Sequence, residues 1–332
     1  MATVQTVTGP IEASALGTTL IHEHLAARDD ALMMQFPHLG TVREGPVEAV
    51  SWEGAEAAAC EAASAAVERD VKTICDPSAM FLGRDVHLMK RVSDATRLQI
   101  VPCTGIYTYD YLPVPLVSRD ADAIADLFVH DIEQGIQGTD IKAAFIKCAA
   151  DEPGVTENVE KIHRAAARAS VRTGGTPIMA HSRPASNTGP RQVEIFEEEG
   201  ADLSRVQIAH TGDSADVSYA EGLLEKGVFI GMDRYGIEMY LPFAQRQETT
   251  LALLEKGYER QMFLAADSCA TIDWFPVEMV EQMTGAGAVK DWSIKMVPDI
   301  VLPELRERGM TEDQERTMTV DNAVRWLTGE DV

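Results

Sequence analysis

The chain has 332 residues, and its 29 Lys and Arg against 53 Asp and Glu give a formal net charge of −24. With 45% hydrophobic residues and no Lys/Arg-rich run, it is neither a disordered chain nor one suited to nucleic acid or an anionic membrane, because both of those partners require positive charge. This length accommodates one large α/β domain or two smaller ones.

The N-terminal residues lack the positive and apolar regions of a signal peptide, and no run of 18 apolar residues occurs. We therefore expect a soluble protein of the cytoplasm. The five cysteines are widely spaced without a Cys-x-x-Cys pair, which indicates free thiols in a reducing compartment.

Short apolar, β-branched runs alternate with longer helical patterns, as in repeated βα units with a parallel sheet. A lead-in at Val4 to Ala15 could form a small hairpin under a barrel. Eight later runs have the continuous apolar character of strands buried on both faces. They are Thr18–Ile21, Val71–Cys75, Gln99–Pro102, Ala143–Ile146, Pro177–Ala180, Val206–Ala209, Val228–Gly231 and Met262–Ala265.

Amphipathic helical patterns separate these runs, and glycines such as Gly200, Gly227, Gly257 and Gly309 mark helix ends. The predicted helices are Trp52–Arg69, Asp85–Thr96, Ala121–Gln134, Glu157–Arg172, Arg191–Glu199, Asp216–Lys226, Phe243–Lys256, Pro298–Arg308 and Glu312–Leu327. Eight βα units without a linker predict a single α/β domain over residues 1–332, a (β/α)₈ TIM barrel with a short N-terminal β extension and C-terminal helices.

Polar side chains stand where five of the predicted strands end. These residues are His22 and His24 after the first strand, Lys147 after the fourth, His181 after the fifth, His210 after the sixth and Asp267 after the eighth. Because the carboxyl ends of barrel strands share one face, where active sites are built, we expect these side chains to converge.

The chemistry of this set favours a site for two metal ions. A His-x-His pair on a strand points both imidazoles to one side, so His22 and His24 could bind one cation with Asp267 as third ligand. His181 and His210, on adjacent strands, could hold a second cation. An ammonium cannot ligate a metal, but Lys147 could bridge both ions if carbon dioxide converts its amine to a carbamate.

Each of these residues also has a plain structural interpretation. A strand-end histidine can be a hydrogen-bonded core residue, Lys147 a lysine whose stem crosses apolar surface, and Asp267 a helix cap. Five strand ends with metal-compatible groups favour the binuclear site over five separate explanations.

The other histidines, His38, His87, His130 and His163, have polar neighbours and are predicted to lie on the surface. Cys148 follows Lys147 and should point toward the helices as a packing residue. Cys269, two residues after Asp267, either lines the substrate pocket or packs beside it.

Longer motifs surround these residues and carry a resemblance that covers essentially the whole chain. They are Gly9–Ile11, Leu16–His24, Gly105–Tyr109, Ile141–Cys148, Ala209–Asp213 and Gly231–Gly236. With the ligand types in this order, the chain resembles the phosphotriesterase family of the amidohydrolase superfamily, and specifically its phosphotriesterase-like lactonase branch.

The resemblance implies that His22, His24 and Asp267 hold a buried metal, His181 and His210 a more exposed one, and carboxylated Lys147 bridges them. It implies Zn²⁺, with Co²⁺, Mn²⁺ or Fe²⁺ as alternatives, and a homodimer. Tyr107 would contact the bridging water or the substrate carbonyl. Arg234 would lie near the pocket entrance, although the residue alone is equally compatible with the surface.

This sequence departs from the lactonases most in residues 271–291, which should cap the site, and around Ala266 and Ser182. Six residues in or near the loops could form an apolar pocket for an acyl chain, or could simply pack over the rim of the barrel. They are Tyr107, Tyr109, Tyr111, Trp274, Phe275 and Met283.

The predicted reaction is hydrolysis of γ- or δ-lactones or acyl homoserine lactones by a metal-bridged hydroxide, with Asp267 as proton acceptor and promiscuous phosphotriesterase activity. The negative charge favours a small neutral ester or lactone substrate, and no organic cofactor is needed. An organophosphate triesterase or carboxylic esterase is the alternative within hydrolases, and a non-catalytic barrel that binds a metal or ligand is the alternative outside them.

Overall fold

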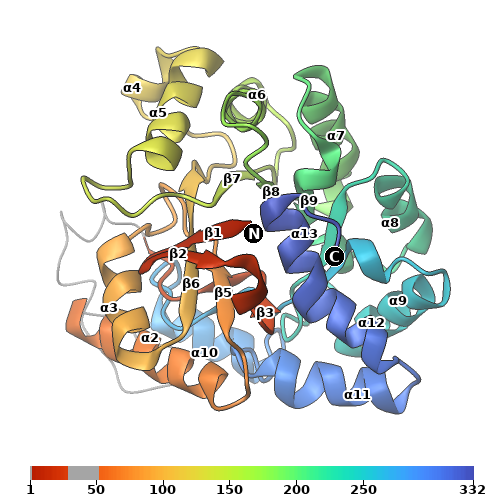
Figure 1. Cartoon of the computed structure of the whole chain (residues 1–332). Helices are drawn as coiled ribbons and strands as arrows, with labels where there is room; N and C mark the ends of the chain where they lie inside the picture. Colours follow the sequence, from red (N-terminus) through yellow and green to blue (C-terminus); the bar gives the residue numbers. More distant parts are fainter. Residues whose placement is uncertain (1, 29–51) are drawn as a thin grey trace.

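The computed structural model describes residues 2–28 and 52–332, and it begins with an antiparallel hairpin. Its strands are β1 (Thr3–Thr6) and β2 (Gly9–Glu12), and the backbone amide of Val7 donates to the carbonyl of Ile100 at 3.0 Å. The hairpin lies across the end of the sheet where the strands begin (Figure 1). The expected hairpin is therefore confirmed.

Eight strands of the described chain pair in parallel, in the order β11-β10-β9-β8-β7-β6-β5-β3. They are β3 (Thr19–Leu20), β5 (Thr73–Asp76), β6 (Gln99–Gly105), β7 (Phe145–Ala149), β8 (Ile178–His181), β9 (Val206–Ala209), β10 (Phe229–Met232) and β11 (Met262–Leu264). Beyond them, β12 (Ser268–Cys269) pairs in parallel with β4 (Glu23–His24) and joins the last unit to the first. Every predicted strand is present, and the (β/α)₈ barrel is confirmed.

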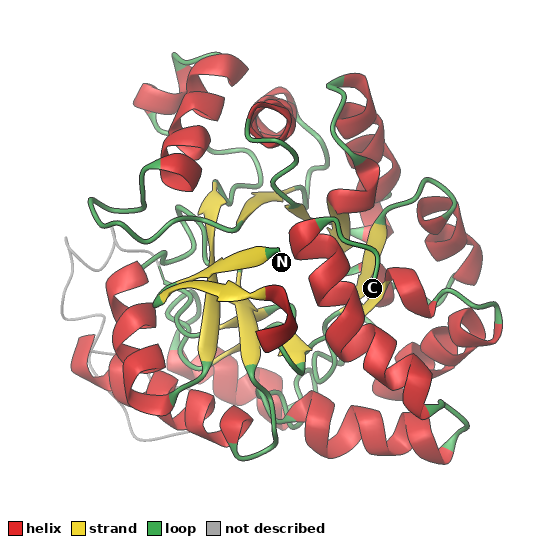
Figure 2. Cartoon of the chain, in the orientation of Figure 1, coloured by secondary structure: helices red, strands yellow, loops and turns green. Residues whose placement is uncertain are grey.

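Helices surround this sheet on its outer side (Figures 1 and 2). They are α2 (Trp52–Val67), α3 (Val86–Thr96), α4 (Val114–Val117), α5 (Ala121–Glu133), α6 (Glu157–Arg172), α7 (Thr188–Glu198), α8 (Val217–Leu224), α9 (Phe243–Glu255), α10 (Val277–Gly285), α11 (Leu302–Glu307), α12 (Glu312–Arg316) and α13 (Asn322–Thr328). π-helical segments at Val297–Val301 and Thr317–Asp321 precede α11 and join α12 to α13.

Local signals explain where many of these helices begin and end. Asp85, Asp120 and Thr156 accept a backbone N–H from the first turn of α3, α5 and α6. The four glycines predicted at helix ends all have positive φ, between 77° and 107°. The short helices α4 and α10 were not predicted, and α10 occupies the middle of the segment expected to be a loop at 271–291.

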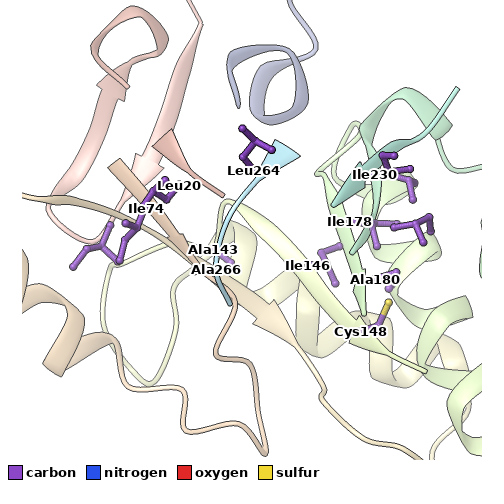
Figure 3. Close-up of a cluster of buried hydrophobic side chains, with 14 of the residues drawn as sticks. Leu20, Ile74, Ala143, Ile146, Cys148, Ile178, Ala180, Ile230, Leu264 and Ala266 are labelled. Atoms are coloured by element: carbon purple, nitrogen blue, oxygen red, sulfur yellow. The ribbon is translucent and has the colours of Figure 1, made fainter. Parts of the chain in front are cut away.

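Alternation along the strands builds two layers of core. Outward-facing residues such as Ile146, Cys148 and Ile178 pack beneath the helices (Figure 3), which confirms Cys148 as a packing residue. Inward-facing residues form a second cluster, in which the ring of Trp326 lies 5.4 Å from that of Phe145. Trp326 comes from α13, so the C-terminal helix fills the bottom of the barrel.

The cysteines and histidines outside the strand ends give a mixed result. All five cysteines are free, as predicted. His87 and His130 are exposed, and His38 lies outside the described residues. The surface prediction for His163 is wrong, because this side chain is fully buried between α6 and α7, stacked on Phe196. No described helix has the length and hydropathy needed to cross a membrane.

Candidate metal centre

The structure brings together all six residues that were predicted to meet at the strand ends. In the first half of the cluster, Asp267 Oδ1 lies 3.3 Å from His22 Nε2 and 3.2 Å from His24 Nε2. Lys147, which is fully buried in β7, places its Nζ atom 3.2 Å from the same His22 nitrogen. Residues far apart in sequence thus share one small volume at the carboxyl end of the barrel.

The second half of the cluster contains the remaining two histidines. His181 Nδ1 lies 3.0 Å from His210 Nε2, and His210 Nε2 lies 3.9 Å from Asp267 Oδ2. The ligand atoms of His22, His210 and Asp267 all lie within 4.8 Å of one another, which is a geometry that could hold a metal ion.

A second layer of side chains fixes the orientation of each imidazole. Asp233 contacts Nδ1 of both His22 (3.1 Å) and His210 (2.9 Å). Ser78 Oγ lies 2.8 Å from His24 Nδ1, and Asp151 Oδ2 lies 2.7 Å from His181 Nε2. Because one ring nitrogen of each histidine has an outer partner, the other nitrogen faces the centre of the cluster, as metal sites require.

Burial sets the charge states of these groups. It lowers the pKa of His22 to about 4, and the positive charge of Lys147 acts in the same direction. It also lowers the pKa of His181 to about 4, where Arg234 contributes. The pKa of His210 is lowered well below its ordinary value. These imidazoles are therefore neutral at pH 7 and have a lone pair to offer. Burial acts to raise the pKa of Asp267, but its histidine neighbours, including the hydrogen bond from His24, and the Arg234 cation hold it well below its usual range, so this carboxylate is ionised.

Lys147 is the exceptional member of the set. Burial lowers the pKa of its amine to about 8, so about a tenth of the residue is uncharged at pH 7, far more than of an ordinary lysine. The neighbouring strand must come close at this point, because a Cβ on Gly105 of β6, where φ is 122°, would overlap the Lys147 carbonyl group. Only glycine fits there without moving the lysine backbone.

The last strand end has an unusual backbone that the buried carboxyl group of Glu23 supports. Asp267 has φ of 51°, in the left-handed region that costs a non-glycine residue about 1–2 kcal/mol. On either side of it, the backbone amides of Ala266 and Ser268 donate to Glu23 at 2.8 and 2.9 Å, and the Ser268 hydroxyl donates at 2.5 Å. Glu23 therefore fixes the turn that points Asp267 into the cluster.

Tyr107 and Arg234 both lie against the cluster. The Tyr107 hydroxyl is 3.1 Å from His181 Nδ1 and 2.8 Å from the hydroxyl of Tyr109. Arg234 is buried, and it donates from Nε to Asp267 and from Nη1 to Asp213, each at 2.9 Å. Its guanidinium also lies 4.5 Å from the ring centre of Tyr240, so the alternative of a surface arginine is excluded.

The sequence of this chain matches a known family over nearly its whole length. The sequence profile described as "Phosphotriesterase family" matches residues 2–327. The chain belongs to this family. Its members are metal-dependent hydrolases that act on ester bonds, so this chain is an enzyme of this class. The alternative of a non-catalytic barrel that only binds a metal or ligand is therefore excluded.

Individual relatives agree with the family. An aryldialkylphosphatase of Saccharolobus solfataricus is 41% identical over 96% of this chain and 97% of its own. A phosphotriesterase homology protein of Mycobacterium tuberculosis is 39% identical over 98% and 97%. The solved structure of the phosphotriesterase from Mycobacterium tuberculosis superposes with a TM-score of 0.90, at 37% identity and 98% coverage of both chains.

Beside the cluster of histidines and Asp267, the mouth of the barrel opens into a cavity of about 400 Å³. The described residues that line it are Phe81, Tyr107, Thr108, Tyr109, Asp273, Trp274 and Phe275. Four of the six predicted pocket residues are among them. Tyr111, which is 73% exposed, and Met283 are not.

Cys269 borders a different cavity of the described residues. It does not line the aromatic cavity, but together with His24 it borders a second cavity of about 760 Å³ between α2 and residues 291–300. The part of the 271–291 segment that reaches the aromatic cavity is its beginning, Asp273 to Phe275.

Sequence reasoning missed the supporting layer of this site. Glu23 stood unremarked between two predicted ligands, and Asp233 was visible only as part of a family motif. Asp151 and Ser78 occur in loops with no pattern that points to a histidine distant in sequence. Their positions follow only from the three-dimensional arrangement of the strand ends.

Proposed function

We propose that the protein is a binuclear-metal lactonase that opens γ- or δ-lactones or acyl homoserine lactones, with promiscuous activity on phosphotriesters. The observation that carries the proposal is one aromatic cavity directly beside a cluster of neutral imidazoles and an ionised carboxylate. The family supports the chemistry, and the resemblance to the lactonase branch supports the substrate.

The donor set fits two divalent cations. His22, His24 and Asp267 would hold the more buried ion, and His181 and His210 the more exposed one. Neutral imidazoles and a carboxylate are ligands that suit Zn²⁺, and Co²⁺, Mn²⁺ or Fe²⁺ would also accept them. Lys147, whose Nζ atom lies 3.2 Å from His22 Nε2, would supply the ligand shared by the two ions.

We assign the bridge to Lys147 as N6-carboxylysine. Its neutral amine would attack the carbon of carbon dioxide, forming an N–C bond and releasing one proton to solvent. The resulting carbamate carries a negative charge and two oxygen ligands, whereas the ammonium form offers donors only. The lowered pKa of the buried amine supports this reaction because only the uncharged amine is a nucleophile.

When bound, the two metals would lower the pKa of a water molecule and polarise the ester carbonyl of the substrate. Asp267 is placed to take the proton of the attacking water and to deliver it to the ring oxygen that leaves. Arg234 holds the second oxygen of Asp267, which orients the carboxylate for this transfer. The Tyr107 hydroxyl, which lies 3.1 Å from His181 Nδ1 at the edge of the aromatic cavity, would contact the substrate carbonyl.

The neighbours of Arg234 favour a neutral substrate. This cation already has Asp267, Asp213 and the ring of Tyr240 as partners, so it is engaged within the protein. The net charge of −24 also disfavours anions. A lactone carries one hydrocarbon arm, for which the aromatic cavity beside the cluster provides space.

An organophosphate triesterase is the second candidate, because a relative that is 41% identical is named an aryldialkylphosphatase. A carboxylic esterase would use the same groups. The test is kcat/KM for the purified protein on γ- and δ-lactones, acyl homoserine lactones, aryl esters and a dialkyl aryl phosphate. We expect a lactone to lead, and the proposal fails if every lactone falls behind the aryl esters or the phosphotriester.

A further inference from the structure

One buried carboxylate lies behind both halves of the cluster. Asp233 follows β10 and is fully buried. Its Oδ2 atom lies 3.1 Å from His22 Nδ1, and its Oδ1 atom lies 2.9 Å from His210 Nδ1. If the two-metal assignment of the proposed function holds, these histidines belong to different ions.

We infer that Asp233 is a positioning residue shared by both metal positions, so that the affinities for the two ions depend on one side chain. Nothing in the family match assigns this role, and Asp233 itself is not among the predicted ligands. The inference rests on the proposed two-metal site and extends it from a set of ligands to the group that aligns them.

Asp233 sets the direction of the histidine lone pairs. A carboxylate oxygen accepts hydrogen bonds, and Asp233 Oδ1 already accepts the backbone N–H of His210, so both Nδ1 atoms carry their protons toward Asp233. Both Nε2 atoms are then unprotonated and face the centre, where His22 Nε2 lies 3.3 Å from Asp267. Asp233 thus selects the tautomer of one ligand in each half.

Asp233 has little freedom to move relative to one histidine without changing its contact with the other. The backbone amide of His210 donates to Oδ1 at 2.8 Å, and the Gln207 amide reaches Oδ2 at 3.5 Å. A Cβ on Gly231 would overlap the carboxylate, so this glycine makes the room that the carboxylate occupies. The rings of His22 and His210 lie only 4.9 Å apart, so a movement of Asp233 displaces both.

The other outer partners provide matched controls because each serves a single histidine. Asp151 contacts His181, a ligand of the exposed position only. Ser78 contacts His24, a ligand of the buried position only. A carboxylate that supports one ligand can therefore be compared with one that supports two.

The experiment measures metal binding to the stripped full-length protein. Chelator-treated wild type, Asp233→Ala, Asp151→Ala and Ser78→Ala are titrated with Co²⁺ and Zn²⁺, following visible absorption and metal content after dialysis. Losing an outer partner typically costs 10–100-fold in metal affinity. We expect Asp233→Ala, which removes both acceptor oxygens, to weaken both ions by about that factor, and Asp151→Ala or Ser78→Ala to weaken one each.

Weakening of only one ion in Asp233→Ala, or of neither, overturns the inference. Circular dichroism checks that each variant is folded, and if Asp233→Ala is not, Asp233→Glu replaces it with the same expectation, because its longer chain shifts both oxygens. Wild type that binds fewer than two ions overturns the two-metal assignment itself. Wild type that binds two ions but prefers phosphotriesters overturns only the lactonase assignment and leaves the role of Asp233 standing.

Discussion

The two walls of the barrel mouth differ in how firmly their side chains are held. On the strand-end wall, His22, Lys147 and His210 are at most 1% exposed, and each imidazole has an outer partner. On the loop wall, Tyr109 is 36% exposed, and Trp274 and Phe275 are partly exposed. The difference indicates that the chemistry depends on the rigid framework, whereas substrate choice depends on side chains that can change without disturbing it.

The strongest way to test the strand-end wall is Asp267→Asn, which keeps the shape of the side chain but removes its negative charge. We expect kcat on the best lactone to fall by at least about 1,000-fold, because a metal ligand and a proton acceptor are lost together. Circular dichroism should be unchanged. A variant that retains a tenth of the wild-type kcat would show that Asp267 is not the proton acceptor.

Lys147→Ala tests the bridging ligand on the same wall. We expect the bound metal to fall below two ions per chain and activity to fall about 100-fold, with partial rescue by acetate or propionate supplying a carboxylate. Lys90→Ala, which removes a lysine from the outer surface of α3, serves as control. Unchanged metal content in Lys147→Ala would rule out carboxylation as a structural requirement.

Trp274→Ala tests the loop wall. Its indole borders the aromatic cavity, with its ring centre 5.6 Å from that of Tyr107. We expect KM for lactones with long acyl chains to rise about 10-fold, since a buried aromatic contact is lost, while unsubstituted lactones are unaffected. Metal content should not change. The control variant Met279→Ala on the same segment should leave KM unchanged for both long-chain and unsubstituted lactones. A uniform loss of kcat would show that the two walls are not separable.

The smallest effect on catalysis is expected behind the strand-end wall, at His163. Its Nε2 atom lies 2.8 Å from the Gln192 amide, which also donates to the carbonyl of His181. Burial lowers the pKa of His163 from 6.5 to about 4. Between these two pH values the unfolded chain binds a proton at His163 and the folded chain does not. Stability should therefore fall as pH falls.

For His163 alone, the loss of stability between pH 7 and pH 5 amounts to about 2 kcal/mol. We expect His163→Gln to lose this share, so that its Tm declines less than that of wild type over this range, with kcat at pH 7.5 within about twofold. Parallel Tm profiles for the two proteins would show that His163 is already protonated or exposed in the folded state.

Much of the framework could be predicted from the sequence because its signals are local. Strands such as Ile178–His181 are continuous apolar runs, and the amphipathic pattern of α6 gives its bounds directly. Once the βα repeat indicates a barrel, the six strand-end residues converge by topology alone. The βα repeat therefore predicts both the barrel and the grouping of the metal-type side chains at one of its ends.

What could not be predicted depends on contacts between elements. The error at His163 arose from its polar neighbours in sequence, whereas the residues one turn away, Val159 and Ala166, lie on the buried face of α6. The short helix α10 follows Pro276 in a segment with little resemblance to the lactonases. Asp233 and Asp151 support their histidines across different strands, and no spacing in the sequence encodes such a pairing.

Trp326 anchors the C-terminal helix at the closed end of the barrel. Because α13 and the β1–β2 hairpin both lie at the closed end of the barrel, they are on the side opposite the mouth (Figure 1). A fusion partner or solid support attached through either would hold the enzyme with its substrate entrance facing solution. The loops at the mouth would then remain available for redesign on an immobilised catalyst.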